Sequence, residues 1–190
     1  MYVIFEGIDG CGKTTQINLL KEKFPNAIIT KEPGGTKFGL KARQMLLHGD
    51  IKSSKAELLL FLADRAEHFK EIIEPNLNGM VISDRGFLSG IAYALSAGFD
   101  LEFLIELNLF ALNKTLPEKI ILFEISKDEL IKRVGQKEQD KIEARGYNYL
   151  LDIQDNMKIV AQKMNLDYIT IDASKKIEDI HKQIIEYINK

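Results

Sequence analysis

Features that define several protein classes are missing from this 190-residue sequence. Only one cysteine is present, Cys11, which excludes a disulfide framework. The longest apolar run covers residues 58–63, far fewer than the roughly 20 residues that span a bilayer. The first residues show neither the basic segment nor the long apolar segment of a signal peptide. We therefore expect a cytoplasmic protein.

An excess of charge of either sign is also missing. Lys and Arg total 26 and Asp and Glu total 28, so the formal net charge is −2. This balance gives no basic surplus for nucleic acid or for an anionic membrane, and neither is expected as a partner. No repeat or low-complexity tract divides the chain. Its length suits one compact domain with a sizeable core, so we expect a single domain over residues 1–190.

What the sequence does contain is a regular alternation of short apolar runs and helical patterns. The apolar runs are continuous and rich in Val and Ile, as is typical of strands that are buried on both faces. They predict strands at 2–6, 27–30, 80–83, 120–125 and 168–171. The helical patterns predict helices at 13–24, 38–47, 55–76, 87–97, 100–113, 127–134, 149–164 and 177–188. This order predicts a three-layer α/β/α fold, a five-stranded parallel sheet with helices on both faces.

The most specific motif directly follows the first predicted strand. Residues 7–15 read GIDGCGKTT, the G-x-x-x-x-G-K-[ST] pattern between a strand and a helix. Glycines let successive backbone N–H groups turn toward a polyphosphate, and the helix start adds its positive dipole end. Lys13 is expected to reach the β- and γ-phosphates, and the Thr14 hydroxyl suits Mg²⁺. We assign ATP binding to Gly7, Ile8, Asp9, Gly10, Cys11, Gly12, Lys13, Thr14 and Thr15.

Polar residues follow the second and third predicted strands, where open parallel sheets bind their ligands. The turn 31–36 reads KEPGGT and is either a plain connector or part of the site, with Arg43 a short step beyond. Asp84 ends the third strand, where a P-loop protein places its Mg²⁺ partner. Arg85 could clamp a phosphate through two parallel hydrogen bonds. A surface ion pair is the alternative for Asp84 and Arg85, but the nearby phosphate loop favours a functional pair.

Three side chains share one face of the predicted helix 55–76. Phe61, Arg65 and His68 follow the i, i+4, i+7 spacing. A ring, a fork of donors and an imidazole could together hold a planar base by stacking and hydrogen bonding. The ordinary alternative is a core Phe61, a surface ion pair at Arg65 and a solvated His68. The spacing alone leaves both interpretations open.

Three further segments are less specific. The predicted helix 100–113 is apolar on more than one face, so it lies deep in the domain or packs against a second subunit. Residues 135–146 read GQKEQDKIEARG, which is either a solvated turn or a lid that carries cations over the phosphates. The helix 177–188 has one apolar face, and Ser174 is expected to cap its start.

Together these motifs resemble the thymidylate kinases over nearly the whole chain. The most specific match is EPGGT at 32–36. The others are GxDGxGKT at 7–14, a helix motif LLxFxADRxxH matched closely at 59–68, a DR[YH]xxSxxAYQ motif matched in part at 84–94, an LP-acid turn at 116–118 and DKIE at 140–143. The resemblance implies the nucleoside monophosphate kinase fold and transfer of the γ-phosphoryl group of ATP to dTMP with Mg²⁺. It also implies a homodimer, which bears on the helix 100–113.

The resemblance further implies roles for single residues. Asp9 would receive the deoxyribose 3′-hydroxyl, Phe61 would stack on thymine, and Arg65 would bond its carbonyl edge. Arg43 and Arg85 would grip the acceptor phosphate. The implied acceptor-binding set is Asp9, Glu32, Pro33, Arg43, Phe61, Arg65, Arg85, Ser89 and Tyr93, and the implied Mg²⁺ residues are Thr14 and Asp84.

Two forms of the family differ in where a catalytic cation lies. One form carries an arginine in the P-loop, whereas here position 10 is glycine. The resemblance therefore implies that a lid at about 133–147 supplies the cations. The implied catalytic residues are Lys13, Arg85, Lys137 and Lys141, and Arg133 is assigned to ATP.

Two positions depart from the family pattern. Gly86 stands where Tyr or His is common, and Ala94 stands where many members have Gln. These changes bear on sugar and base selection, so another nucleoside monophosphate kinase, acting on dUMP or UMP, is one alternative. A non-kinase P-loop ATPase switch is the other. Such switches often carry a second acid after the Mg²⁺ acid, whereas Asp84 is followed by arginine.

Overall fold

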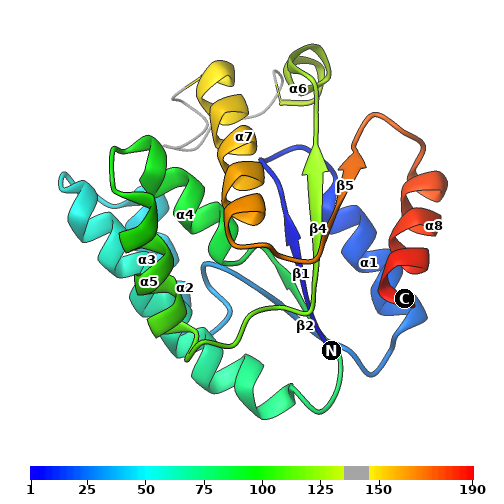
Figure 1. Ribbon diagram of the computed structural model, residues 1–190, viewed down its shortest axis with the longest axis horizontal. Helices are drawn as coiled ribbons and strands as arrows, with labels where there is room; N and C mark the ends of the chain where they lie inside the picture. The colour runs from blue at the N-terminus through cyan, green and yellow to red at the C-terminus, as the bar shows by residue number, and fades with distance from the viewer. Residues whose placement is uncertain (135–145) are drawn as a thin grey trace.

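The computed structural model describes residues 1–134 and 146–190 and has a parallel sheet at its centre (Figure 1). Five strands lie in the order β2-β3-β1-β4-β5, all parallel. Their bounds are Tyr2–Glu6 (β1), Ile28–Lys31 (β2), Val81–Asp84 (β3), Lys119–Glu124 (β4) and Tyr168–Asp172 (β5). The predicted α/β fold with a five-stranded parallel sheet is confirmed.

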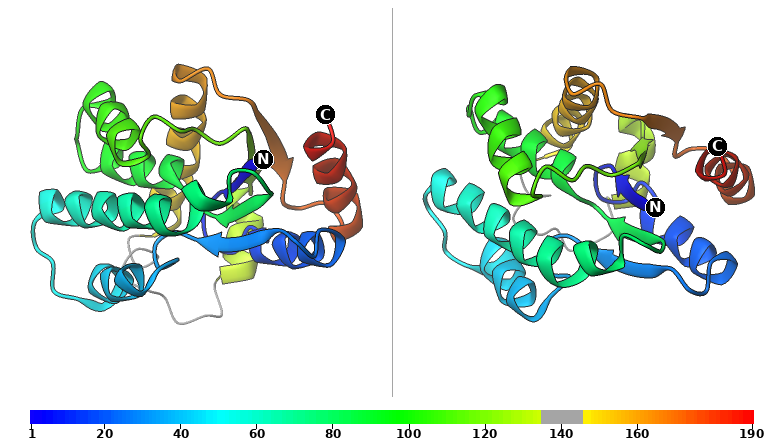
Figure 2. Two further views of the ribbon diagram at one scale, coloured as in Figure 1. Left: turned by 90° about the horizontal axis from the view of Figure 1, so that it is seen from below. Right: turned by 60° about the horizontal axis from the view of Figure 1, so that its bottom comes forward.

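Helices cover both faces of this sheet. In Figures 1 and 2, α1 and α8 lie on one side, and α3, α4, α5 and α7 lie on the other. The helices are Lys13–Lys23 (α1), Lys37–His48 (α2), Ser54–His68 (α3), Phe87–Ser96 (α4), Leu101–Ala111 (α5), Lys127–Val134 (α6), Tyr147–Lys163 (α7) and Ile177–Ile188 (α8). No helix in the described ranges is both long and apolar enough to cross a membrane.

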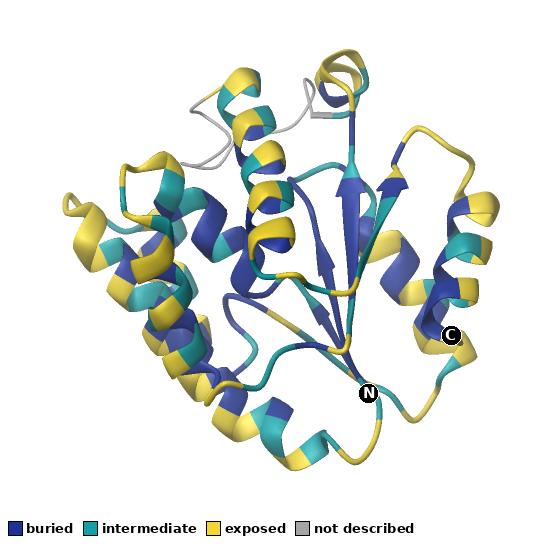
Figure 3. Cartoon of the chain, viewed as in Figure 1, coloured by how far each residue is buried: buried dark blue, intermediate teal, exposed yellow. Residues whose placement is uncertain are grey.

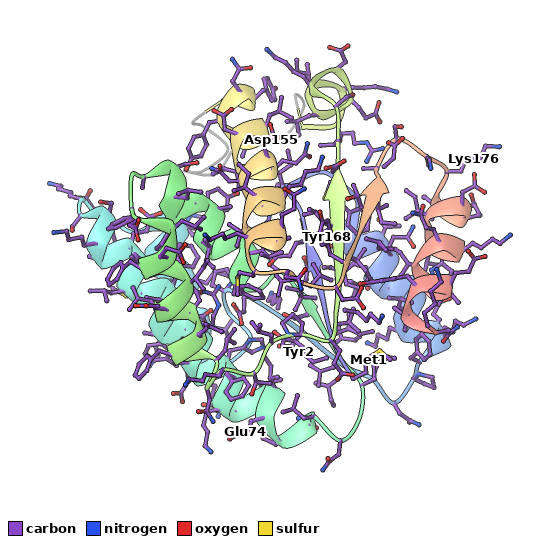
Figure 4. The ribbon with its side chains drawn as sticks, viewed as in Figure 1. Met1, Tyr2, Glu74, Asp155, Tyr168 and Lys176 are labelled. Atoms are coloured by element: carbon purple, nitrogen blue, oxygen red, sulfur yellow. The ribbon has the colours of Figure 1, made fainter. Side chains whose placement is uncertain are left out.

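The core includes the whole of β1, which lies between β3 and β4. All five residues of β1 are buried, and so are the four inner residues of β4 (Figure 3). Burial on both faces explains why these strands read as continuous apolar runs. Met1 and Tyr2, labelled in Figure 4, mark the end of the sheet where β1 begins. The carboxyl ends of the strands gather at the opposite edge, and the site lies there.

The helical stretch predicted over 55–76 is present, but only its first part is α-helical. The α-helix ends at His68, and a π-helical turn at Phe69–Ile73 and a 3₁₀ turn at Glu74–Asn76 follow it. Pro75 lies in the 3₁₀ turn, and proline cannot continue an α-helix because it lacks the N–H and its ring meets the preceding turn.

The prediction that Ser174 caps the start of α8 is wrong. Lys176 occupies the cap position of α8, without a side-chain hydrogen bond. Ser174 lies too early in the chain, because both its N–H and its hydroxyl bind Asp172 Oδ1, at 2.9 and 2.7 Å. This side-chain turn ends β5 instead of starting the helix.

The burial of α5 tests the two interpretations of its apolar sequence, which were a position deep in the domain and packing against a second subunit. Leu104 and Ala111 are buried, whereas Phe103 is 50% exposed and Phe110 is 85% exposed. Only one face of α5 therefore lies in the core of this chain. The interpretation of a helix buried on all sides is wrong for this chain.

Candidate active site

The phosphate loop closes around the side chain of Lys13. Gly7, Gly10 and Gly12 have positive φ angles, and α1 begins directly after them at Lys13. Lys13 is only 6% exposed, and its Nζ donates to the carbonyl oxygens of Gly7 (2.9 Å) and Ile8 (3.0 Å). The loop thus holds a full positive charge beside the free N–H groups of a helix start, which is a strong anion site.

A cavity of about 620 Å³ opens beside this loop. Its walls come from the phosphate loop, the ends of β2 and β3, and the helices α1, α2 and α6. The lining residues are Asp9, Gly10, Gly12, Lys13, Thr14, Thr15, Lys31, Glu32, Arg43, Asp84, Arg85 and Arg133. Cations outnumber carboxylates among them, so the cavity suits polyanionic ligands. Lys31, which directly precedes the EPGG turn, is a lining cation to which the sequence analysis assigned no individual role.

Thr14 and Asp84 meet at the floor of this cavity. Strand β3 pairs with β1 so that Asp84 lies level with Phe5, just before the phosphate loop. Thr14 Oγ1 donates to Asp84 Oδ2 at 3.0 Å. Mg²⁺ prefers hard oxygen ligands and keeps several waters, so one hydroxyl and one carboxylate beside nucleotide phosphates fit it. The described residues hold no group of three or more His, Cys, Asp or Glu that would suit a fully protein-bound metal.

Arg85 turns back over the phosphate loop because of its backbone. Its φ is 70°, which is uncommon for a residue other than glycine and is often found at functional sites. Its guanidinium donates to Gly7 O at 2.6 Å, to Ser89 Oγ at 3.1 Å and to Asp9 Oδ1 at 2.7 Å. The ion pair of Arg85 is therefore with Asp9, not with the neighbouring Asp84.

Asp9 is the carboxylate at the mouth of the cavity. Burial, the largest single influence, raises its pKa, but the combined effect of Arg85, Lys13 and Arg43 outweighs burial and holds the pKa below its ordinary value. Asp9 is thus a hydrogen-bond acceptor at neutral pH. This property suits the role that the family resemblance implies, which is to receive a sugar hydroxyl.

Glu6 is a residue of the site that the sequence interpretation missed. It is fully buried at the end of β1, and its carboxyl accepts the Ser89 N–H at 3.3 Å and the Ser89 hydroxyl. Burial raises the pKa of Glu6. Through Ser89, Glu6 supports the hydrogen bond from Arg85. The sequence did offer a signal for Glu6, because it is the only acidic residue of an otherwise apolar strand and lies at the end of that strand next to the phosphate loop.

The turn after β2 carries a buried carboxylate, Glu32, and is contacted by Arg43 of α2. Arg43 Nη1 donates to Pro33 O at 3.2 Å, and Arg43 faces the main cavity. Glu32 accepts from Arg65 Nε at 2.9 Å through one oxygen, and its other oxygen lies 2.8 Å from His68 Nδ1. Glu32 therefore acts through its neighbours, because both of its oxygens are already bound.

Arg65 and His68 are both buried, so the alternative of a surface ion pair and a solvated imidazole is wrong. Arg65 is 2% exposed and His68 is not exposed at all. His68 Nε2 also lies 2.6 Å from Thr30 Oγ1, so the imidazole links β2 to α3. Burial would raise the pKa of Glu32, but Arg65 and His68 overcome this effect and lower it. The cluster is thus an ionised carboxylate between two donors.

Phe61 lies one helical turn before Arg65, beside a second cavity of about 70 Å³. The other lining residues are Ser54, Glu57, Leu58, Gly90, Tyr93, Ala94, Ala97 and Phe99. The ring of Tyr93 packs against that of Tyr149, with centroids 6.3 Å apart. The structure therefore brings Phe61 and Tyr93 to one small, largely apolar pocket between α3 and α4.

A third cavity, of about 160 Å³, lies on the other side of the phosphate loop. Arg133 spans it, donating to Gly10 O at 3.3 Å and to Ala173 O at 2.7 Å. Lys175 and Ile177, after β5, line it together with Cys11 and Thr15. The sequence interpretation missed the residues after β5 because they lie far along the chain from the loop. Lys137 and Lys141, and most of the proposed lid, lie outside the described residues.

Asp64 ties α3 to the EPGG turn and gives a testable pH dependence. Its Oδ1 accepts the Gly34 N–H at 3.2 Å, and burial, followed by nearby Glu32, raises its pKa to about 6. This pKa exceeds the value in the unfolded chain. The contribution of protonated Asp64 to the free energy of unfolding is therefore fully present below about pH 4 and is lost as the pH rises through about 6. Asp64→Asn keeps an acceptor for Gly34. Relative to the wild type, it should therefore gain about 2 kcal/mol of unfolding free energy between about pH 4 and pH 8.

Chemical denaturation at both pH values measures this difference. Asp155→Asn, an exposed position on α7, is the matched control and should show no such change. A difference between Asp64→Asn and the wild type that does not vary with pH would contradict the assignment.

A parallel sheet, a lysine-centred phosphate loop and two arginines across the cavity define the class of P-loop nucleotide phosphotransferases. Comparison with known proteins makes the class more specific. Residues 5–184 match the family model described as thymidylate kinase, so the chain belongs to the thymidylate kinase family. This confirms the resemblance seen in the motifs.

Curated relatives with the same family name align with this chain over almost their whole length. The chain is 56% identical to the thymidylate kinase of Aliarcobacter butzleri over 189 residues, covering 100% of this chain and 99% of that protein. It is 52% identical to that of Sulfurovum sp., with 99% of each chain covered. The crystal structure of thymidylate kinase from Ehrlichia chaffeensis aligns with a TM-score of 0.80 at 29% identity, covering 100% of this chain and 98% of that one.

Proposed function

We propose that this protein transfers the γ-phosphoryl group of ATP to dTMP and thereby forms dTDP and ADP. One observation carries the proposal. A single cavity has Lys13 and the phosphate loop on one side and Arg43 and Arg85 on the other, and the pocket of Phe61 lies on α3 nearby. Such a cavity can hold two phosphorylated molecules that face each other. Membership of the thymidylate kinase family supports dTMP as the acceptor.

The reaction needs no nucleophilic side chain, because the acceptor is itself a phosphate oxyanion. The protein has to align two anions and reduce their repulsion. Lys13 can exchange its bonds to the loop carbonyls for bonds to the donor phosphates. Arg85 and Arg43, which now donate to backbone oxygens, can do the same for the acceptor phosphate. Both arginines add planar, bidentate donors where charge concentrates.

Mg²⁺ is the metal that the donor set suits. Thr14 and Asp84 would hold it beside the nucleotide, where it would neutralise phosphate charge. We further propose that the adenine of ATP occupies the cavity beside Arg133, and that Phe61 stacks on the thymine, whose carbonyl edge meets Arg65. Lys137 and Lys141 remain proposed lid cations on the strength of the family resemblance.

An ADP-release assay with ATP and a panel of monophosphates tests the function. We expect dTMP to give the highest kcat/KM among dTMP, dUMP, UMP, CMP, AMP and GMP. The margin over dUMP should be modest, about fivefold, because one methyl group contributes only about 1 kcal/mol of apolar contact. A clear preference for UMP or dUMP would instead identify a different monophosphate kinase. ATP hydrolysis that dTMP does not divert into dTDP would identify a switch.

We also propose a homodimer formed through the outer surfaces of α3 and α5. Leu59 on α3 is 61% exposed, and Phe103 and Phe110 are exposed on α5, which contacts α3. Large apolar side chains on neighbouring helices are typical of a surface that a second subunit covers. Sedimentation velocity distinguishes a dimer from the 21.6 kDa monomer, and a monomer at micromolar concentration would contradict the proposal.

A cytoplasmic location is proposed as well. The single cysteine, Cys11, lies buried against Lys13 as a free thiol, which suits a reducing compartment. Cell fractionation tests this location, and recovery in an extracellular fraction would contradict it.

A further inference from the structure

The guanidinium of Arg65 is held by acceptors from three separate segments. Its Nε donates to Glu32 Oε2 at 2.9 Å, one terminal nitrogen to Asn108 Oδ1 at 2.5 Å, and the other to Gly86 O at 3.0 Å. A guanidinium carries five N–H groups, so one on each terminal nitrogen is left for a ligand. Three anchors that lie in different directions fix the plane of the group as well as its position.

Asn108 is one of these three acceptors, and the proposed phosphoryl transfer gives it no role. It lies on α5, is 1% exposed, and does not line the cavities beside Lys13 or Phe61. Its Nδ2 donates to Leu104 O at 2.7 Å, one turn earlier on the same helix. This bond sets the orientation of the amide, because the reversed amide would point its oxygen at the Leu104 carbonyl oxygen and its N–H groups at the guanidinium, which only donates. The amide oxygen is therefore directed at Arg65.

Gly90 allows the guanidinium to lie close to the pocket of Phe61. A Cβ at position 90 would stand 2.9 and 3.0 Å from the two terminal nitrogens of Arg65. The backbone of α4 thus packs directly against the guanidinium, and Gly90 also lines the Phe61 pocket. Arg65 is in this way confined between Asn108 on one side and the wall of that pocket on the other.

We propose that Asn108 is a positioning residue for base recognition, acting through Arg65. This inference rests on the proposed function, in which Arg65 meets the base. Because arginine only donates hydrogen bonds, a guanidinium held in one plane can donate to the 4-carbonyl oxygen of thymine and disfavours the 4-amino group of cytosine, which is itself a donor. Without the Asn108 oxygen, Arg65 loses one of its three anchors and can turn, so this discrimination weakens. The Asn108 side chain thus serves base selection from outside the pocket.

The experiment compares dTMP and dCMP as acceptors for Asn108→Leu, which has a similar size but no acceptor. We expect the KM for dTMP to rise about tenfold and the ratio of kcat/KM for dTMP over dCMP to fall about tenfold, as for the loss of one charge-assisted hydrogen bond. The KM for ATP should stay within about twofold. Asn108→Asp keeps the acceptor and should restore the ratio to within about threefold of the wild type.

Asn156→Leu is the matched control. Asn156 donates to Ala92 O and Ser96 Oγ of α4, the helix that packs against the Arg65 guanidinium, and is not hydrogen-bonded to Arg65 itself, so the base ratio should not change. If Asn108→Leu does not fold, as judged by thermal unfolding, Asn108→Ala is measured in the same way, because it removes the acceptor without adding bulk.

Arg65→Lys separates this inference from the function on which it rests. It keeps the charge but loses the fork, and it should abolish most of the discrimination. A lower ratio in Arg65→Lys with an unchanged ratio in the Asn108 variants would overturn the role of Asn108 alone. An equal rise of the KM for dTMP and the KM for ATP in those variants would do the same. An unchanged ratio in Arg65→Lys would overturn both the base-reading role of Arg65 and the inference.

Discussion

Replacing Lys13 by alanine should lower the kcat of phosphoryl transfer by about a thousandfold while the domain stays folded. Lys13 supplies a full charge inside the phosphate loop, and within the described residues its Nζ bonds to two backbone carbonyls and the Cys11 sulfur and to no carboxylate. Stabilising the negative charge that develops in the transition state is usually the largest contribution that a protein makes to the rate of such a reaction. The removal leaves no unpaired buried charge, so the cost in folding stability should be small.

ADP release at saturating ATP and dTMP measures the loss, and thermal unfolding shows whether the variant folds. Lys21→Ala is the matched control, since Lys21 is an exposed residue near the end of the same helix and should be close to neutral in both assays. A folded Lys13→Ala variant with near-normal turnover would show that the loop is not the phosphate site.

Glu32→Gln should produce the largest loss of stability, about 3 kcal/mol of unfolding free energy. Glu32 is buried between Arg65 and His68, whose side chains are almost fully shielded from solvent. Glutamine has nearly the same shape, but it removes the only negative charge hydrogen-bonded to Arg65 in the described residues. Breaking a buried pair by removing one partner is costly because the other charge stays behind without compensation. The KM for dTMP should rise as well, because a neutral amide oxygen holds Arg65 less firmly than the carboxylate does.

The Glu32 effect should also depend on pH. The folded pKa of Glu32 is lowered, so its contribution to stability is present above its ordinary pKa and is lost as the pH falls through the folded value. The advantage of the wild type over Glu32→Gln should therefore shrink in acid. Denaturant unfolding at about pH 7 and about pH 3 measures this change. Glu74→Gln, in a partly exposed pair with Lys70, is the control and should cost less than about 1 kcal/mol.

The features that could be predicted from the sequence are those formed by residues that are neighbours in the chain. The phosphate loop is a backbone structure made by neighbours in sequence, so GIDGCGKTT identified it without any knowledge of packing. Asp84 was placed correctly at the sheet edge because a strand end in a parallel sheet has only one edge to go to. The Val- and Ile-rich runs located all five strands, since burial on both faces leaves a continuous apolar pattern.

Partners that are distant in sequence could not be predicted in this way. Glu6 and Ser89 are 83 residues apart, and Arg65 and Asn108 are 43 apart. The spacing of Phe61, Arg65 and His68 was equally compatible with a surface face, and their burial became clear only from the packing of α3 against β2 and α5. The change from α-helix to π-helix after His68 was not visible either, because the helical pattern continued past it.

The sequence by itself determined the order of strands and helices, the phosphate loop and the membership of the family, because each follows from local backbone preferences and short motifs. Only the tertiary structure decided which buried polar groups bind one another and which side chains form the wall of each cavity. Hydrogen bonds have short range and strict direction, so their partners depend on how whole helices pack against the sheet. That packing is a property of the entire chain, and no short stretch of residues records it.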